Sequence, residues 1–292
     1  MKKVTKAVIL AAGLGTRMLP ATKSIPKELF PIVDKPALQY HIEECVKSGI
    51  TSILIVVSRG KTLIEDHFDR SPELEDRLLS GGAGKAAVLA EVQAISSMAD
   101  IMYVRQKEMN GTGNAVQMAK AFTGDEPFVV MYGDDVILGE NPVTKQLLDA
   151  YYEYGKGVCG VQEVSEEAIL KYSSLKVENL RDNYYRVDTM IEKPKKEEIY
   201  SLYSILGRLV LPANIYDILD KTPIGANNEL QITDAMKILA ETEKMTAVDF
   251  IGKRYDMGNK FSVMQAQVEV GVNHPEFGED LKAYLKEFVK TL

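Results

Sequence analysis

Residues 4–18 read VTKAVILAAGLGTRM, and this stretch predicts both a fold class and the place of a binding loop. Val4 to Leu10 is an apolar run with β-branched residues, which is typical of a buried strand. The run ends abruptly in Ala11-Ala12-Gly13, so the strand leads directly into a glycine loop. Backbone N–H groups of such a loop can approach phosphate oxygens. The stretch therefore predicts an α/β protein with an anion-binding loop after its first strand.

Strand and helix patterns alternate through the first half of the chain. From Pro36 to Gly49 apolar residues recur at helical spacing, with proline near the start and glycine at the end. Ile53 to Val57 is typical of the next strand, and Ile101 to Arg105 and Phe128 to Tyr132 of two more. Between these two, a helix is expected whose apolar face holds Ala115, Met118, Ala119 and Phe122. This alternation predicts a mainly parallel sheet covered by helices on both faces.

The pattern changes after about Gly155, where strand-like runs follow one another with less helix between them. These runs are Val158 to Glu163, Leu175 to Leu180, Tyr184 to Glu192 and Leu202 to Leu211. They predict a mixed extension of the sheet. We expect one continuous domain over residues 1–292, with internal boundaries near residues 155 and 258 and C-terminal helices at 259–292.

The last predicted helix carries an apolar stripe. Its members are Leu281, Leu285, Phe288 and Val289, at spacings of four, seven and eight residues. Such a stripe can pack on a core or bind another subunit. We expect core packing, and the stripe also permits a homodimer or a larger homo-oligomer.

Composition excludes several classes of protein. With 292 residues and 46% hydrophobic content, the chain can bury a large core. The net charge of −7 and the lack of a basic stripe argue against nucleic acid as a partner. No run of about 18 uncharged apolar residues predicts a membrane span, and Met1-Lys2-Lys3 leads to no signal-peptide cleavage pattern, so we expect the cytoplasm. Cys45 and Cys159 suit two buried free thiols.

The glycine loop does not match the two commonest phosphate-binding motifs. Met18 stands where a dinucleotide-binding fingerprint needs its last glycine, and no Gly-Lys-Ser or Gly-Lys-Thr follows as in a P-loop. Arg17 and Lys27 instead add positive charge near the loop. A bare Gly-x-Gly fits an ordinary tight turn about as well. The added Arg17 and Pro26-Lys27-Glu28 favour a phosphate site.

Three further segments combine residue types that suit a nucleotide, a metal ion and a sugar. Gln106 ends a strand shortly before Gly111-Thr112-Gly113-Asn114, where an amide and backbone donors could surround a planar base. The strand before Gly133-Asp134-Asp135 ends in two carboxylates, which suit Mg²⁺. In Met190-Ile191-Glu192-Lys193-Pro194 a carboxylate could bind sugar hydroxyls and an ammonium a phosphate. Taken alone, each segment also fits an ordinary helix start or turn.

The chain resembles the bacterial UTP–glucose-1-phosphate uridylyltransferases, within the larger group of sugar-phosphate nucleotidyltransferases, nearly from end to end. The resemblance is most specific over residues 13–36, which include PATK at 20–23 and PKELFPIVDKP at 26–36. Residues 205–208 (ILGR) and 229–235 (ELQITDA) also match. It implies a single Rossmann-like α/β nucleotidyltransferase domain with a mixed, mainly parallel central sheet flanked by helices, and a homo-oligomer. Within this domain, it implies a nucleotide-binding part at 1–155 and a sugar-binding part at 156–258.

The resemblance also implies roles for individual residues. The uracil would be surrounded by Ala11, Gly13, Glu28, Gln106 and Gly111, with Ala12, Gly15 and Thr16 completing the nucleotide loop. Asp134 matches the family's metal-binding aspartate, and Asp256 matches a position that completes the metal site in related enzymes. Glu192 and Lys193 match the sugar and sugar-phosphate contacts.

This chain departs from the family's pattern at three positions. Thr112 and Asn114 stand in the family's Gly-Leu-Gly-His segment, and Ser173 replaces a glycine that contacts the sugar. A serine side chain there could crowd or reposition the glucose.

The implied reaction is in-line attack of glucose 1-phosphate on the α-phosphorus of UTP, with Mg²⁺, giving UDP-glucose and pyrophosphate. Arg17 and Lys27 would grip the triphosphate, Asp134 would hold the metal and Lys193 would orient the sugar phosphate. Two alternatives stay open: a thymidylyltransferase or another sugar nucleotidyltransferase, and a non-catalytic UDP-sugar-binding paralogue.

Overall fold

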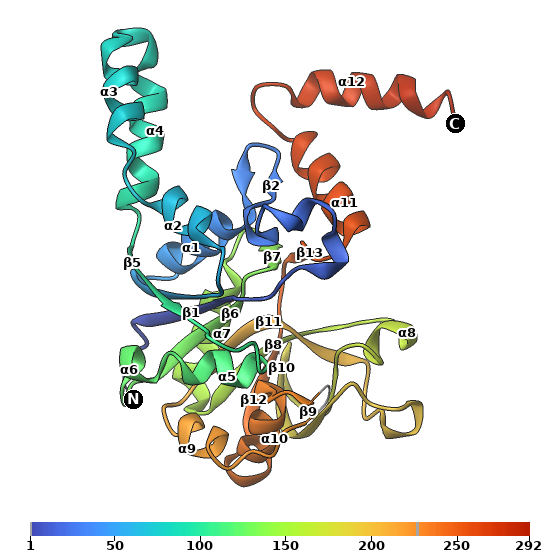
Figure 1. The fold of residues 1–292 in the computed structure, drawn as a ribbon. Coiled ribbons are helices and arrows are strands. Elements are labelled where there is room, and N and C mark those ends of the chain that lie inside the picture. The colour runs from blue at the N-terminus through green and yellow to red at the C-terminus, as the bar shows by residue number, and fades with distance from the viewer. Residues whose placement is uncertain (1, 226–227) are drawn as a thin grey trace.

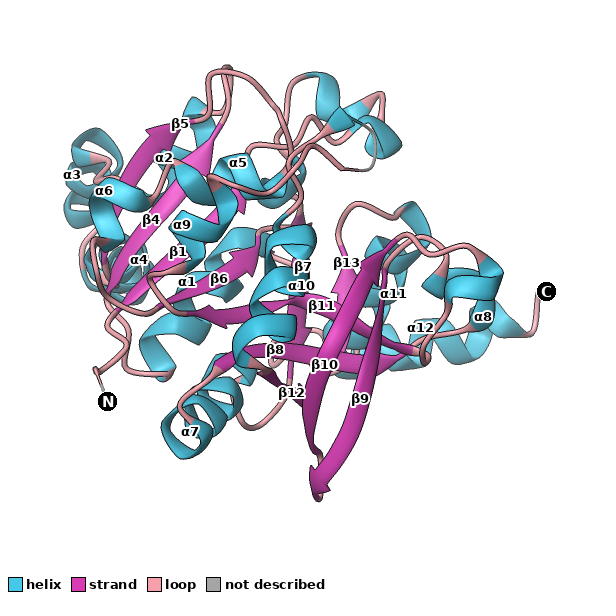
Figure 2. Ribbon diagram, turned by 90° about the horizontal axis from the view of Figure 1, so that it is seen from below, coloured by secondary structure: helices cyan, strands magenta, loops and turns pink. Residues whose placement is uncertain are grey.

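The computed structural model describes residues 2–225 and 228–292, and its centre is a nine-stranded mixed sheet. The order of the strands in this sheet is β5-β4-β1-β6-β11-β8-β12-β10-β9. Two small two-stranded sheets join β13 to β7 and β2 to β3. Figures 1 and 2 show helices on both faces of the large sheet.

The strands are β1 Lys6–Ala11, β2 Pro31–Ile32, β3 Lys35–Pro36, β4 Ser52–Val57, β5 Asp100–Arg105, β6 Phe128–Tyr132, β7 Asp135–Leu138, β8 Gly157–Glu163, β9 Ser173–Arg181, β10 Tyr184–Glu192, β11 Tyr203–Leu211, β12 Met245–Asp249 and β13 Lys253–Asp256. The α-helices are α1 Ala37–Lys47, α2 Thr62–Phe68, α3 Pro72–Ser80, α4 Ala86–Ser97, α5 Thr112–Gln117, α6 Lys120–Thr123, α7 Val143–Tyr154, α8 Glu166–Ile169, α9 Ile215–Leu219, α10 Ile232–Glu243, α11 Lys260–Gly271 and α12 Gly278–Val289.

Strand β1 lies inside the parallel half of the sheet, between β4 and β6. Its neighbouring residues Val8 and Ile9 are both fully buried, but they belong to different apolar clusters. Successive side chains of a strand point to opposite faces, so the two clusters are the cores on the two faces of the sheet. The continuous apolar sequence of β1 is therefore explained by burial on both sides.

The predicted mixed extension of the sheet is confirmed. Strand β11 runs antiparallel to both β6 and β8, while β12 runs parallel to β8. Strands β10 and β9 then add an antiparallel edge. The single helix expected around Ala115 to Phe122 is divided instead into α5 and α6. Its backbone tightens where Ala119 N–H donates to the carbonyl of Val116, three residues back.

The C-terminal helix does not pack on the core, so that expectation was wrong. Helix α12 extends away from the sheet (Figure 1), and Gly278 is its buried residue. Phe288 and Val289 are 45% and 64% exposed. The periodic stripe correctly predicts an amphipathic helix, but helical spacing does not say which surface covers it.

Two other expectations are confirmed by the structure. Cys45 and Cys159 are free and buried. Across the described ranges, no helix combines the length and the apolar character that crossing a membrane requires. The boundaries near residues 155 and 258 stay a prediction.

Candidate active site

A cavity of about 300 Å³ lies at the carboxyl ends of β1 and β6, beside the glycine loop. Ligands of α/β sheets bind at this edge of the parallel strands. The cavity is lined by Leu10, Ala12, Gly13, Lys27, Glu28, Gln106, Met109, Gly111, Thr112, Ala115, Tyr132, Asp134 and Glu229.

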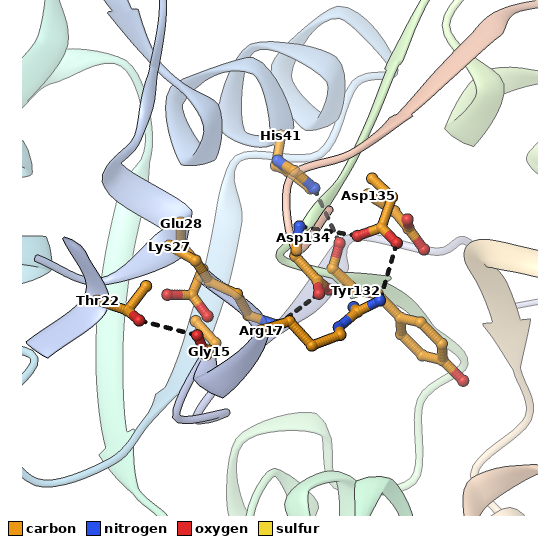
Figure 3. A network of polar contacts seen from close by, with 12 residues as sticks. Gly15, Arg17, Thr22, Lys27, Glu28, His41, Tyr132, Asp134 and Asp135 are labelled. Atoms are coloured by element: carbon orange, nitrogen blue, oxygen red, sulfur yellow. Dashed lines mark hydrogen bonds and ion pairs between the residues drawn. The ribbon is translucent and has the colours of Figure 1, made fainter. Parts of the chain in front are cut away.

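The glycine loop is shaped by one left-handed residue and one side-chain hydrogen bond. Gly15 has φ +66°, and a Cβ there would lie 3.0 Å from Cγ2 of Thr22. The Thr22 hydroxyl donates to the Gly15 carbonyl at 2.8 Å (Figure 3). Gly13 lies beside the Lys27 ammonium, 3.7 Å from where its Cβ would stand. The loop therefore leaves room for the lysine and for a ligand close to the backbone.

Lys27 and Asp134 form the charged centre of the cavity. The Lys27 Nζ lies 2.5 Å from Oδ2 of Asp134 (Figure 3). Burial opposes charge on Lys27, but the Asp134 carboxylate outweighs it and raises the pKa of the lysine. Burial also opposes charge on Asp134, but Lys27 outweighs it and lowers the pKa of that carboxyl. Both groups are therefore ionised at neutral pH.

A second acid lies next to Asp134 because β13 pairs with β7. Asp256 faces Asp135 across these two strands, and the Met257 N–H donates to the Asp134 carbonyl at 2.8 Å. Oδ2 of Asp256 lies 3.3 Å from Nη1 of Arg17, whose side chain is 63% exposed. The structure therefore brings two predicted cations and two predicted acids to one end of the cavity.

These carboxylates fit a magnesium ion that is shared with a substrate. Among residues 2–225 and 228–292, no cluster of three or more acidic, histidine or cysteine side chains could enclose a metal ion. Mg²⁺ commonly takes only one or two carboxylates and completes its shell with water and substrate phosphates. Asp134 and Asp256, each paired with a side chain that could move to phosphate oxygens, suit that mode of binding.

Glu28 is held by a lysine that the sequence analysis missed. The Lys61 Nζ donates to both Glu28 oxygens at 2.9 and 2.8 Å and to the Ala11 carbonyl at 2.5 Å. Burial raises the pKa of Glu28, and Lys61 opposes that rise. Lys61 follows β4, which lies beside β1, but nothing in the local sequence distinguishes it from an exposed lysine.

The other end of the cavity is formed by Gln106 and a glycine turn. Gln106 is 4% exposed, and its Nε2 donates to the carbonyl of Gly111 at 3.2 Å. Gly111 has φ +100°, and a Cβ there would stand 2.4 Å from the Leu230 carbonyl oxygen. No other residue fits without moving that backbone. Met109, Thr112 and Glu229 also line this end, and the sequence analysis missed their contribution to the wall.

The predicted sugar residues lie outside this cavity, at the end of β10. Glu192 pairs with Ser173 of β9, and burial raises the pKa of Glu192. Lys193 has φ +48°, and its N–H donates to the Tyr172 carbonyl at 2.8 Å. The structure thus places both side chains on one strand end, near the turn before Ser173.

Ser173 is 3% exposed and bonds to β11. Its hydroxyl accepts from the Ile205 N–H at 3.1 Å. Of the other predicted residues, the structure puts seven in the cavity wall and the rest around it. Those in the wall are Ala12, Gly13, Lys27, Glu28, Gln106, Gly111 and Asp134, and those outside it are Ala11, Gly15, Thr16, Arg17, Glu192, Lys193 and Asp256.

A buried ion pair supports the aspartate loop from behind. Arg208 is 1% exposed, and its Nη2 lies 2.6 Å from Oε2 of Glu44. Its Nη1 donates to the Asp135 carbonyl at 2.9 Å. The Asp135 carboxylate pairs with Arg254 at 2.5 Å. Burial raises the pKa of Asp135 to about 6, with Arg254 opposing the rise.

Comparison with known proteins first identifies the class of enzyme. The family model described as nucleotidyl transferase matches residues 6–271, which include every predicted site residue. A UTP–glucose-1-phosphate uridylyltransferase of Bacillus subtilis, YngB, is 47% identical over 289 residues, which cover 99% of this chain and 97% of that protein. A UTP–glucose-1-phosphate uridylyltransferase of Staphylococcus epidermidis is 45% identical, with 98% and 99% of the two chains covered.

Solved structures agree with these relatives. A UTP-bound UGPase from Acinetobacter baumannii has a TM-score of 0.89 at 33% identity, covering 98% of this chain and 99% of that one. A UDP-glucose pyrophosphorylase complexed with UDP-glucose has a TM-score of 0.85 at 36% identity, covering 93% and 100%. This chain therefore belongs to the nucleotidyl transferase family and, within it, to the bacterial UTP–glucose-1-phosphate uridylyltransferases.

Proposed function

We propose that this protein transfers the uridylyl group of UTP to glucose 1-phosphate, forming UDP-glucose and pyrophosphate. The observation that carries the proposal is the cavity with two chemically different ends. One end holds the Lys27–Asp134 pair, and the other holds Gln106 and the Gly111 turn. A triphosphate suits the first end and a planar base the second. Relatives with nearly full-length matches carry the same activity in their names.

The reaction needs positioning and charge stabilisation more than proton transfer. A phosphate oxygen of glucose 1-phosphate attacks the α-phosphorus of UTP in line, and the bond to the leaving pyrophosphate breaks. The attacking oxygen is already anionic at neutral pH, so no general base is required. Lys27 and Arg17 bind the triphosphate and neutralise charge on the leaving group. Their present partners, Asp134 and Asp256, are thereby freed.

Magnesium is the cofactor that this arrangement suits. When bound, it would supply positive charge that stabilises the negative charge developing on the phosphates. Asp134 would hold it, with Asp256 as the second carboxylate. The two carboxylates, each paired with a cationic side chain, support this assignment.

The remaining side chains orient the two substrates. Glu28, kept in place by Lys61, and Gln106 contact the uracil end, with the backbone of the glycine loop against the nucleotide. Glu192 binds glucose hydroxyls and Lys193 the sugar phosphate. The left-handed backbone of Lys193, whose N–H donates to the Tyr172 carbonyl, fixes the point where this side chain leaves the main chain, directly after Glu192.

We also propose a cytoplasmic homodimer or larger homo-oligomer. The exposed apolar side chains of α12, including Phe288 and Val289, support a subunit contact.

The direct test is pyrophosphate release from UTP and glucose 1-phosphate with Mg²⁺, with EDTA as the metal-free control. Parallel reactions replace UTP by dTTP and glucose 1-phosphate by galactose 1-phosphate. Metal-dependent release that favours UTP and glucose 1-phosphate is expected. A preference for dTTP would indicate a thymidylyltransferase. Tight UDP-glucose binding without release from any pair would indicate a non-catalytic binder.

A further inference from the structure

The side-chain amide of Gln106 is held in one orientation. Its backbone N–H donates to the Val57 carbonyl at 2.8 Å, which anchors the residue at the end of β5. Its side-chain Nε2 donates to the Gly111 carbonyl at 3.2 Å and to Oδ1 of Asn114 at 2.9 Å. Both Nε2 hydrogens are therefore occupied by protein acceptors.

The Gly111 carbonyl and Asn114 together hold the amide in one orientation. A backbone carbonyl can only accept, so a rotated Gln106 would place its own oxygen against another oxygen. Asn114 then completes the arrangement by taking the second hydrogen. Within the described residues, Oε1 of Gln106 has no protein donor, so the cavity receives an acceptor and no donor from this side chain.

An acceptor at this point distinguishes pyrimidine bases. Uracil and thymine carry an N–H at position 3, whereas cytosine has a lone pair there. A fixed carbonyl oxygen therefore favours the first two and repels the third. Sites built to hydrogen-bond an N–H reject analogues that lack it, because the buried partner is left unpaired.

We infer that Asn114 is a positioning residue that sets the base selectivity of the site by locking the Gln106 amide. The inference rests on the proposed function in that it takes the base to lie at the Gln106 end. Asn114 lies on the first turn of α5, behind Gln106, and is not part of the cavity wall. It acts on the base through Gln106 alone.

The test uses two variants of the full chain, Asn114→Ala and Asn114→Asp. Alanine removes the acceptor, whereas aspartate keeps an oxygen in its place near the start of α5, where a negative charge is tolerated. The kcat and KM are measured for UTP, dTTP and CTP, and dissociation constants are measured for UTP and CTP. Thermal unfolding checks that both variants stay folded.

In the Asn114→Ala variant, the ratio of kcat/KM for UTP to kcat/KM for CTP is expected to fall about tenfold. This is about the effect of losing one hydrogen bond. The KM for UTP should rise, and kcat should stay nearly unchanged. UTP and dTTP should weaken together, because both bases carry the N–H. Asn114→Asp should restore the ratio.

Two results would overturn the inference: an unchanged UTP-over-CTP ratio in Asn114→Ala, or an Asn114→Asp variant that behaves like alanine. A purely structural role would lower binding of all three nucleotides alike. If the wild-type chain binds UTP but releases no pyrophosphate, the proposed function fails, and the ratio of dissociation constants still tests the inference.

Discussion

Replacing Lys27 with methionine should strengthen metal binding and weaken catalysis at the same time. The Lys27 ammonium lies 2.5 Å from Asp134, the carboxylate that is proposed to hold the metal. The lysine is thus a competitor of the metal before UTP binds and a partner of the triphosphate afterwards. Methionine keeps an unbranched side chain of nearly the same length, one atom shorter, and removes the charge and the hydrogen bonds.

When a divalent ion binds Asp134, the Lys27 ammonium can either stay beside it or move away. The response that costs less free energy sets how strongly the lysine weakens metal binding. If the ammonium stayed about 4 Å from the metal, repulsion at an effective dielectric constant of 20 would be about 8 kcal/mol. Moving the lysine away costs only its hydrogen bond to a charged group, about 1.5–3 kcal/mol. Removing this competition should tighten metal binding to the free protein by about 10- to 100-fold. Loss of a cation that stabilises the transition state should lower kcat by about 10²- to 10³-fold.

Binding of Mn²⁺, followed by electron paramagnetic resonance at pH 8, measures the first effect in the absence of nucleotide. Pyrophosphate release measures the second. Lys27→Arg is the matched control, because it keeps the charge next to Asp134 and should bind Mn²⁺ as weakly as the wild type. The reasoning is refuted if Lys27→Met binds Mn²⁺ no more tightly than Lys27→Arg.

Two further predictions concern the groups around the cavity. Glu44→Gln should lower the free energy of unfolding by about 3–5 kcal/mol at pH 7, measured in urea, because it breaks the buried pair with Arg208. Burial opposes the charge of Glu44 but Arg208 outweighs it and lowers its pKa from 4.5; the wild type should therefore lose this stability as pH falls below 4.5, and the variant should lack that loss. Ser173→Gly should cost about 1–3 kcal/mol in the same assay, since the buried Ile205 N–H loses its acceptor. An unchanged unfolding free energy together with a lower KM for glucose 1-phosphate would show that Ser173 crowds the sugar instead.

The buried strands were the most predictable part of the fold. The run expected at Phe128 to Tyr132 coincides with β6, and Ile53 to Val57 differs from β4 by one residue. These strands are buried on both faces, so their sequences are continuously apolar and their ends are marked by polar or glycine residues. The packing of helix α12 was harder to predict, because the same apolar stripe can pack on the core of its own chain or on a partner subunit.

The candidate site could be predicted where its residues directly follow predicted strands. The glycine loop and Asp134 directly follow strands of one parallel sheet, so their convergence follows from topology. Lys61 could not be assigned in this way. Its contact with Glu28 joins segments 33 residues apart, and nothing local distinguishes it from an exposed lysine. Long-range ion pairs of this kind become visible only once the chain is folded.

The three departures from the family pattern show why residue identity alone does not predict a role. Ser173 was expected to crowd or reposition the glucose, and Asn114 and Thr112 were noted only as departures from the family segment, but each of the three has a bond to its own protein. Ser173 accepts from a β11 backbone N–H, and Asn114 accepts from Gln106. Thr112 accepts from the Ile232 N–H at 3.0 Å, which ties the start of α5 to that of α10. A polar side chain near a site can therefore affect substrate choice by positioning its neighbours, and its hydrogen-bond partners decide which variants separate that role from direct contact.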